Sequence, residues 1–299
     1  MNDVRVRRYD LLTDYHKVYD FLVSTFDIAT MNSYLLPGYW EYGHSHTAAD
    51  FRRTARMGLW ELDGQIVGIA GSEMWPGLGT AHLHTAPGYE HLLPDILDWA
   101  ELELPEVTPD GRRQLGVWIT DNEPLKQELL AERGYTLDET VPVKVFTYDK
   151  PFPIRELPAG FRMISGTEID PEKLAEFWWY GFENQGQMTD DQIDFIQKLN
   201  CAPHGNPELT TVIVAPDGTY ACALCMWVDE PNQFAYLEPM ATRPEYRGLG
   251  LATFALSNVM QRTKEMGATI CNGGPPEFYS KIGFQNHLNR QKWVKEYLR

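Results

Sequence analysis

The spacing of apolar residues predicts two successive sets of strands and helices along this chain of 299 residues. In the first half, apolar segments on either side of Asp63-Gly64 predict a β-hairpin over residues 58–70 that turns at these two residues. Apolar positions at helical spacing then predict a helix over residues 123–133, which Gly134 is placed to end. Residues 28–47 are rich in Tyr, Gly and Pro, and they predict an irregular segment.

The second half has the same order of predicted elements. Residues 210–228 place apolar segments on either side of Pro216-Asp-Gly218 and predict a second hairpin. Residues 233–242 predict a strand, and residues 251–266 predict a long helix with Leu251, Leu256 and Met260 among its apolar positions. We also expect helices over residues 172–182 and 189–199.

The two halves are separated by residues 150–160, where three Pro residues exclude both a continuous helix and a central strand. This segment predicts a linker between two domains. We therefore expect a first domain over residues 1–150, a linker over 151–160 and a second domain over 161–299.

The chain is organised around residues 236–253, which read as a strand, a short basic loop and the start of a helix. Gly248 and Gly250 allow the backbone of the loop to approach a ligand closely. The first N–H groups of a helix attract an anion, and the helix dipole reinforces this attraction. Arg247 adds a positive charge. These features suit a diphosphate.

Two nucleotide-binding motifs do not fit this loop. The P-loop requires Gly-Lys-Ser/Thr, which does not occur here, and the dinucleotide fingerprint requires a Gly where Thr253 stands. What is present is Arg247-x-x-Gly250-x-Ala252. This pattern resembles the diphosphate loop of the GNAT superfamily, the acetyl-CoA-dependent N-acetyltransferases. Residues 278–284, Phe-Tyr-Ser-Lys-Ile-Gly-Phe, resemble the late signature of the same family.

An internal repeat extends this resemblance to the whole chain. Residues 85–90 align with residues 242–247, and Arg133-Gly-Tyr135 aligns with Ile282-Gly-Phe284. The alignment implies an α+β fold, with two tandem acyl-CoA N-acyltransferase-like domains built on mixed sheets. It also implies that the first copy has lost the cofactor site, because the residues that would form it are replaced: Glu90 for Arg247, Leu93 for Gly250, Asp95 for Ala252 and Leu130 for Tyr279.

The resemblance implies roles for particular residues of the second domain. Tyr279 matches the tyrosine that often protonates the departing thiolate, and the alternative is an aromatic ring packed beneath the loop. Glu238 lies where many members place a carboxylate base or an amine anchor, and the alternative is a carboxylate that caps or pairs. Acetyl-CoA would be held by the strand end and the loop: Met240, Ala241, Thr242, Arg247, Gly248, Leu249, Gly250, Leu251 and Ala252.

Acceptor recognition in this family usually falls on the first two helices of the domain and the loop between them. Trp178, Glu183 and Asp190 lie in this region, where aromatic and acidic side chains suit a cation. The alternative is that the aromatic residues are ordinary core.

The resemblance thus implies an N-acetyltransferase acting on the primary amine of a small cationic molecule. Two alternatives stay open. One is a non-catalytic acyl-CoA-binding or regulatory protein, which needs no acid or base. The other is transfer to a protein or peptide amine, which would call for an open acceptor groove.

Composition narrows the partners. The net charge of −16 argues against nucleic acid and is compatible with a cationic substrate drawn in by the field of the protein. No apolar run is long enough for a membrane span and no signal peptide is recognisable, so we expect a cytoplasmic protein. We expect no metal, although His44 with His46 and His82 with His84 could each place two imidazoles on one face.

Overall fold

The computed structural model describes residues 4–46, 49–74, 77–186, 188, 190 and 201–297. The chain divides into two compact units. The first contains Met1–His44, Ala48–Val143 and Asn286–Arg299, and the second contains Ser45–Thr47 and Lys144–Gln285. No helix in the described ranges is long and apolar enough to cross a bilayer.

The first unit is a mixed sheet in the order β1-β2-β3-β4-β6-β13, with β5 beside β6. Helix α3 packs against β2, β3 and β4, and α1 packs against β3. The bounds are β1 (Arg5–Arg8), α1 (Leu11–Ser24), α2 (Pro37–Ser45), β2 (Gly58–Leu62), β3 (Gln65–Gly71), β4 (Thr80–Thr85), α3 (Leu93–Glu103), β5 (Glu106–Val107), β6 (Arg113–Thr120), α4 (Pro124–Glu132) and β13 (Gln285–Tyr297).

The prediction of an irregular segment over residues 28–47 is wrong for its second half, where α2 forms. Pro37 stands at the first position of that helix, where the missing N–H of proline costs nothing. Trp40 of α2 is buried in the core under β3, so tertiary packing stabilises a helix of weak amphipathic pattern.

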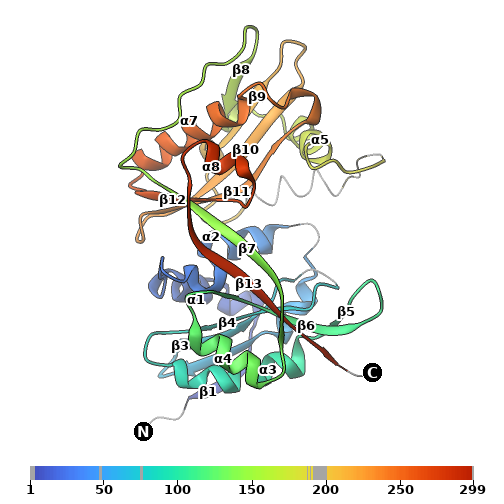
Figure 1. The fold of residues 1–299 in the computed structure, drawn as a ribbon, viewed down its shortest axis with the longest axis vertical. Helices are drawn as coiled ribbons and strands as arrows, with labels where there is room; N and C mark the ends of the chain where they lie inside the picture. Colours follow the sequence, from blue (N-terminus) through green and yellow to red (C-terminus); the bar gives the residue numbers. More distant parts are fainter. Residues whose placement is uncertain are drawn as a thin grey trace. The chain divides into compact units, whose positions relative to one another are not determined.

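The second unit is a mixed sheet in which the end of β7 pairs with β12, followed by β11, β10, β9 and β8. Helix α7 covers one face of the sheet, and α5 packs against β10 and β11 from the other side (Figure 1). The bounds are β7 (Thr136–Thr147), β8 (Arg162–Ser165), α5 (Pro171–Gly181), β9 (Thr210–Val214), β10 (Tyr220–Asp229), β11 (Phe234–Thr242), α7 (Leu251–Glu265), β12 (Ile270–Gly273) and α8 (Glu277–Lys281). The helix predicted over residues 189–199 lies outside the described residues except for Asp190.

The unit boundaries differ from those expected from the linker. Residues 144–150, expected in the first domain, belong to the second unit, where Lys144–Thr147 pairs with β12. Residues 286–299, expected in the second domain, belong to the first unit, where β13 pairs with β6 from Arg290 to Tyr297. The second unit therefore includes only the end of β7, Lys144–Thr147, and the first unit includes β13 from Asn286 onward.

The backbone hydrogen bonds of the two units match at the aligned positions. Tyr89 N–H donates to the Ala86 carbonyl at 3.1 Å, and Tyr246 N–H donates to the Arg243 carbonyl at 3.0 Å. At the second aligned site, the N–H groups of Tyr135 and Phe284 each donate at 3.0 Å to the carbonyl of the residue five positions earlier. The glycine before each has a positive φ, 79° at Gly134 and 105° at Gly283. The repeat is thus present in the backbone.

Candidate functional site

The site lies where β11 separates from its neighbour β12. The two strands run parallel and pair only at Phe234 and Ala235 among the described residues. Two residues later, the Leu237 N–H donates to Oδ1 of Asn272 at 2.8 Å. The Asn272 side chain thus accepts a hydrogen bond that the backbone of a paired strand would otherwise accept. Beyond this point, no described residue pairs with β11 on that side.

Backbone alternation decides which N–H groups face the opening. The Arg243 N–H donates to the Ala221 carbonyl of β10 at 3.0 Å, which fixes the direction at the end of the strand. Successive N–H groups of a strand point to opposite sides, so the N–H of Thr242 and that of Met240 point away from β10. They face the opening between β11 and β12.

The loop after β11 is shaped by two glycines in the left-handed region. Gly248 has a φ of 81° and Gly250 a φ of 79°. Gly250 caps α7, and its carbonyl accepts the N–H of Phe254 at 3.1 Å. The N–H groups of the first turn of a helix have no partner within the helix. The loop therefore directs several amide donors toward one place.

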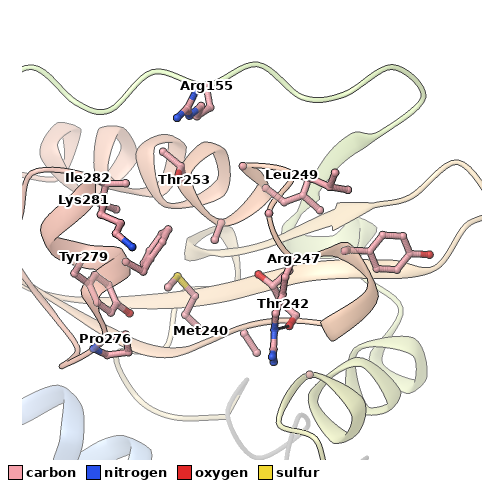
Figure 2. Close-up of a pocket in the computed structure, with 18 of the residues that line it drawn as sticks. Arg155, Met240, Thr242, Arg247, Leu249, Thr253, Pro276, Tyr279, Lys281 and Ile282 are labelled. Atoms are coloured by element: carbon pink, nitrogen blue, oxygen red, sulfur yellow. Dashed lines mark hydrogen bonds between the residues drawn. The ribbon is translucent and has the colours of Figure 1, made fainter.

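These elements surround a cavity of about 1130 Å³ in the second unit. Figure 2 shows Met240 in the middle of the cavity wall, with Tyr279 to one side and Arg247 to the other. The wall is completed by the end of α5 and by the chain segment before β8. All nine residues predicted to hold acetyl-CoA line this cavity: Met240, Ala241, Thr242, Arg247, Gly248, Leu249, Gly250, Leu251 and Ala252.

Tyr279 of α8 lines the same cavity and is 7% exposed. Its ring lies over two glycines, because a Cβ at Gly273 would come within 2.6 Å of the ring and one at Gly274 within 3.1 Å. The buried Lys144 ammonium donates to the carbonyls of Pro275, at 2.5 Å, and Pro276, at 3.0 Å. The loop before α8 is therefore held from β7, and the tyrosine is held in place.

Glu238 does not line the cavity, although it precedes Met240 by only two residues. The register with β10 shifts between Leu237 and Met240, so β11 carries one extra residue there. Leu237 and Met240 consequently both face α7, whereas Glu238 points with Cys225 to the opposite face. Glu238 thus lies on the opposite face of β11 from Met240, and not on the cavity side where we expected it.

The surroundings of Glu238 are poorly solvating. Burial raises the pKa of its carboxyl from 4.5 to about 7. Burial first, and the Glu238 charge in addition, raises the pKa of the neighbouring Cys225 thiol to about 11. No described residue provides a hydrogen bond or an ion pair to this carboxylate. A carboxyl group with a pKa near neutrality can exchange protons at physiological pH.

The residues expected to bind the acceptor are separated in the structure. Trp178 is 3% exposed and stacks on Phe182, so it is part of the core beneath α5. Asp190 is exposed and does not line the cavity. Glu183 does line it, but its carboxylate accepts from the Arg247 guanidinium at 2.6 Å. Glu183 therefore forms an ion pair with Arg247, the residue that we expected to bind the diphosphate.

The histidine pairs each have local partners. His84 lies within 2.7 Å of the Thr25 hydroxyl, and burial lowers the pKa of its imidazole to about 3. His44 Nδ1 lies 2.7 Å from the Trp40 carbonyl. Within the described ranges, no group of three or more His, Cys, Asp and Glu side chains is arranged to hold a metal ion.

Three residues of the site were missed from the sequence. Asn272 separates the strands, Lys144 holds the loop before α8, and Arg155 of the linker lines the cavity. Each is a single polar residue without a motif around it. Its role depends on a contact with a residue far away in the chain, which no local pattern reports.

A parallel strand pair that opens beside a glycine loop, a helix start and a tyrosine defines a class, the acyl-CoA-dependent N-acyltransferase fold. The sequence comparison agrees, because residues 172–284 match the model of the Acetyltransferase (GNAT) family. No curated protein matches the chain. The match lies within the second unit and includes β9, β10, β11, β12, α7 and α8.

Solved structures similar to this chain cover nearly all of it. A tandem GNAT protein from the clavulanic acid biosynthesis pathway superposes with a TM-score of 0.66 at 14% identity, covering 98% of each chain. A GCN5-related N-acetyltransferase from Sphaerobacter thermophilus has a TM-score of 0.60 at 16% identity, over 98% of this chain and 95% of the other. A GNAT-family acetyltransferase from Colwellia psychrerythraea has a TM-score of 0.60 at 13% identity, over 98% and 100%. At these identities the likeness concerns the fold.

Proposed function

We propose that the second unit binds acetyl-CoA in this cavity and transfers its acetyl group to the primary amine of a small cationic molecule. The observation that carries the proposal is the order of groups along the cavity. Loop amides and Arg247 lie at one end, the N–H groups of Met240 and Thr242 lie along the strand, and Tyr279 lies at the other end. In acetyl-CoA the pantetheine arm runs from the diphosphate to the thioester, so the strand N–H groups would face the arm and the acetyl carbonyl, and Tyr279 would lie near the thioester sulfur.

Each group has a task in the reaction. The strand N–H groups hold the thioester and polarise its carbonyl, which lowers the barrier to attack by the amine. The amine nitrogen forms a bond to the carbonyl carbon, and the carbon–sulfur bond then breaks. The Tyr279 hydroxyl gives its proton to the departing thiolate. Glu238 takes a proton from the amine through water, because it faces the other side of β11.

The acidity of the chain supports a cationic acceptor. The net charge of −16 attracts amines from solution, and Glu238 supplies an anion beside the strand once it is deprotonated. A protonated amine approaching Glu238 would be stabilised until it loses its proton.

The test is thiol release from acetyl-CoA over a panel of polyamines, aminoglycosides, amino acids and peptides. We expect amine-dependent release that is fastest with a small polycation. Binding of acetyl-CoA without release for any amine would favour the non-catalytic alternative. Release that requires peptides would favour transfer to a protein amine.

A further inference from the structure

The segment between the two predicted domains forms part of the cavity wall. Arg155 and Glu156 line the cavity, although they belong to the proline-containing stretch that we expected to act only as a linker. Figure 2 shows Arg155 on an extended segment that passes the start of α7. The segment lies within the second unit, so its position there is a property of that unit.

Arg155 lies directly over the glycine that caps α7. A Cβ built on Gly250 would meet the Arg155 side chain at 3.6 Å from Cδ and 3.7 Å from Cγ. The aliphatic stem is therefore in van der Waals contact with the loop, and the guanidinium begins one bond beyond Cδ. It is thus within reach of any anion held at the helix start.

The Arg155 guanidinium has no ion pair or hydrogen bond with any residue that the structure describes. The other arginine of the cavity, Arg247, is engaged by Glu183 at 2.6 Å and by the Thr242 carbonyl at 3.1 Å. Arg155 is therefore the more available of the two arginines. A guanidinium binds phosphate oxygens through two parallel hydrogen bonds, which makes it well suited to a diphosphate.

We infer that Arg155 binds the diphosphate of acetyl-CoA from the side opposite the loop amides. This inference rests on the proposed function. The diphosphate would then be held between the amides around Gly250 and a cation from the linker. A segment that we expected only to join two domains would become part of the cofactor site and would be less accessible when acetyl-CoA is bound.

Calorimetry with acetyl-CoA tests the contact. We expect Arg155→Ala to weaken binding about tenfold or more, because a hydrogen bond to a charged group contributes roughly 1.5–3 kcal/mol. Arg155→Lys should recover part of the loss. Lys150→Ala is the matched control, since Lys150 belongs to the same segment but contacts Gln285 rather than the cavity. Glu156→Gln, which removes the neighbouring negative charge, should not weaken binding.

Titration with 3′-dephospho-CoA identifies the phosphate. If Arg155 contacts the diphosphate, Arg155→Ala loses the same factor for this ligand as for CoA. A loss restricted to CoA would assign Arg155 to the 3′-phosphate and overturn the inference. Equal affinities of the wild-type chain and Arg155→Ala would also overturn it.

Proteolysis provides an independent measurement on the wild-type chain. Trypsin cleaves after Arg155, and bound acetyl-CoA should slow this cleavage about tenfold at saturation, while cleavage after the exposed Arg112 is unchanged. Cleavage after Arg155 at an unchanged rate in a chain that binds acetyl-CoA would contradict the inference. A wild-type chain that binds no acetyl-CoA would instead overturn the proposed function, and this inference with it.

Discussion

Each unit has the same turn after its central strand, but a different kind of side chain stands at the aligned position of that turn. In the first unit, the loop is closed by its own acid: Oε1 of Glu90 accepts the Gly88 N–H at 3.0 Å. Hydrogen bonds from its own N–H and from that of Gly88 hold the pKa of the Glu90 carboxyl below its usual value. In the second unit, the aligned residue is Arg247, which lies in the loop after β11 and lines the cavity.

The helices that follow show the same contrast. Leu92 and Leu93 at the start of α3 are 6% and 5% exposed, because they pack into the core of the first unit. Leu249 in the loop of the second unit is 45% exposed and lines the cavity. Leu130, aligned with Tyr279, is buried in the first core without a polar atom. The same backbone arrangement is thus filled by apolar side chains in the first unit and surrounds an open cavity in the second.

Replacement of Tyr279 by Phe should have the largest effect, because it makes this position as apolar as Leu130. General acid catalysis contributes ~100- to 10,000-fold, so we expect kcat to fall by about that factor while the Kd of acetyl-CoA is nearly unchanged. Tyr148→Phe is the matched control, since it removes a buried hydroxyl of the same core that bonds to Thr263 at 2.8 Å. Near wild-type kcat in Tyr279→Phe would remove Tyr279 from the mechanism.

Glu238→Gln should produce a comparable or smaller loss of rate and change its pH dependence. The base must be deprotonated, so the wild-type rate should rise with pH through about 7, and the variant should lack this limb. A rise in KM for the amine with the limb retained would instead make Glu238 an amine anchor.

The same variant should also differ in stability. The folded chain raises the pKa of Glu238, so folding favours the protonated form, and this contribution is lost as pH rises from 4.5 through about 7. Glu238→Gln should therefore have a higher Tm than the wild-type chain at pH 8 and a similar Tm at pH 4. If the variant and the wild-type chain had the same Tm at pH 8 as well as at pH 4, the desolvation of Glu238 would be contradicted.

Changing the charge in each of the two loops tests the contrast directly. Arg247→Glu places an acid in the second loop, as Glu90 does in the first, and should weaken acetyl-CoA binding about a hundredfold. Glu90→Gln should leave binding unchanged, with one site per chain in calorimetry. Two cofactor sites per chain would mean that the first unit has kept its own.

The smallest effect is expected from Glu183→Gln. An exposed ion pair contributes roughly 0–1 kcal/mol, and breaking it should tighten acetyl-CoA binding by about fivefold at most. The side chains of Glu183 and Arg247 are 58% and 50% exposed, which places this pair in that class. Weaker binding in Glu183→Gln would mean that the carboxylate orients Arg247 rather than competing for it.

The sequence alone determined the features that depend on local backbone conformation. Gly248 and Gly250 predicted the loop because only glycine adopts such φ angles without strain, and the helix after it followed from apolar spacing. The repeat was readable for the same reason, since each copy encodes the same turns. The nine residues predicted to hold acetyl-CoA line one cavity because they are consecutive or nearly so.

Tertiary structure decided the features that depend on contacts between distant segments. The extra residue in β11 turned Glu238 away from Met240, because strict alternation ends where a register shifts. Glu183 reached Arg247 and Arg155 reached Gly250 across many residues of sequence. Strand β13 pairs with β6, and the end of β7 pairs with β12. Both pairings use backbone hydrogen bonds that any extended segment can make. Such pairings carry no side-chain signature, so only the folded chain reveals them.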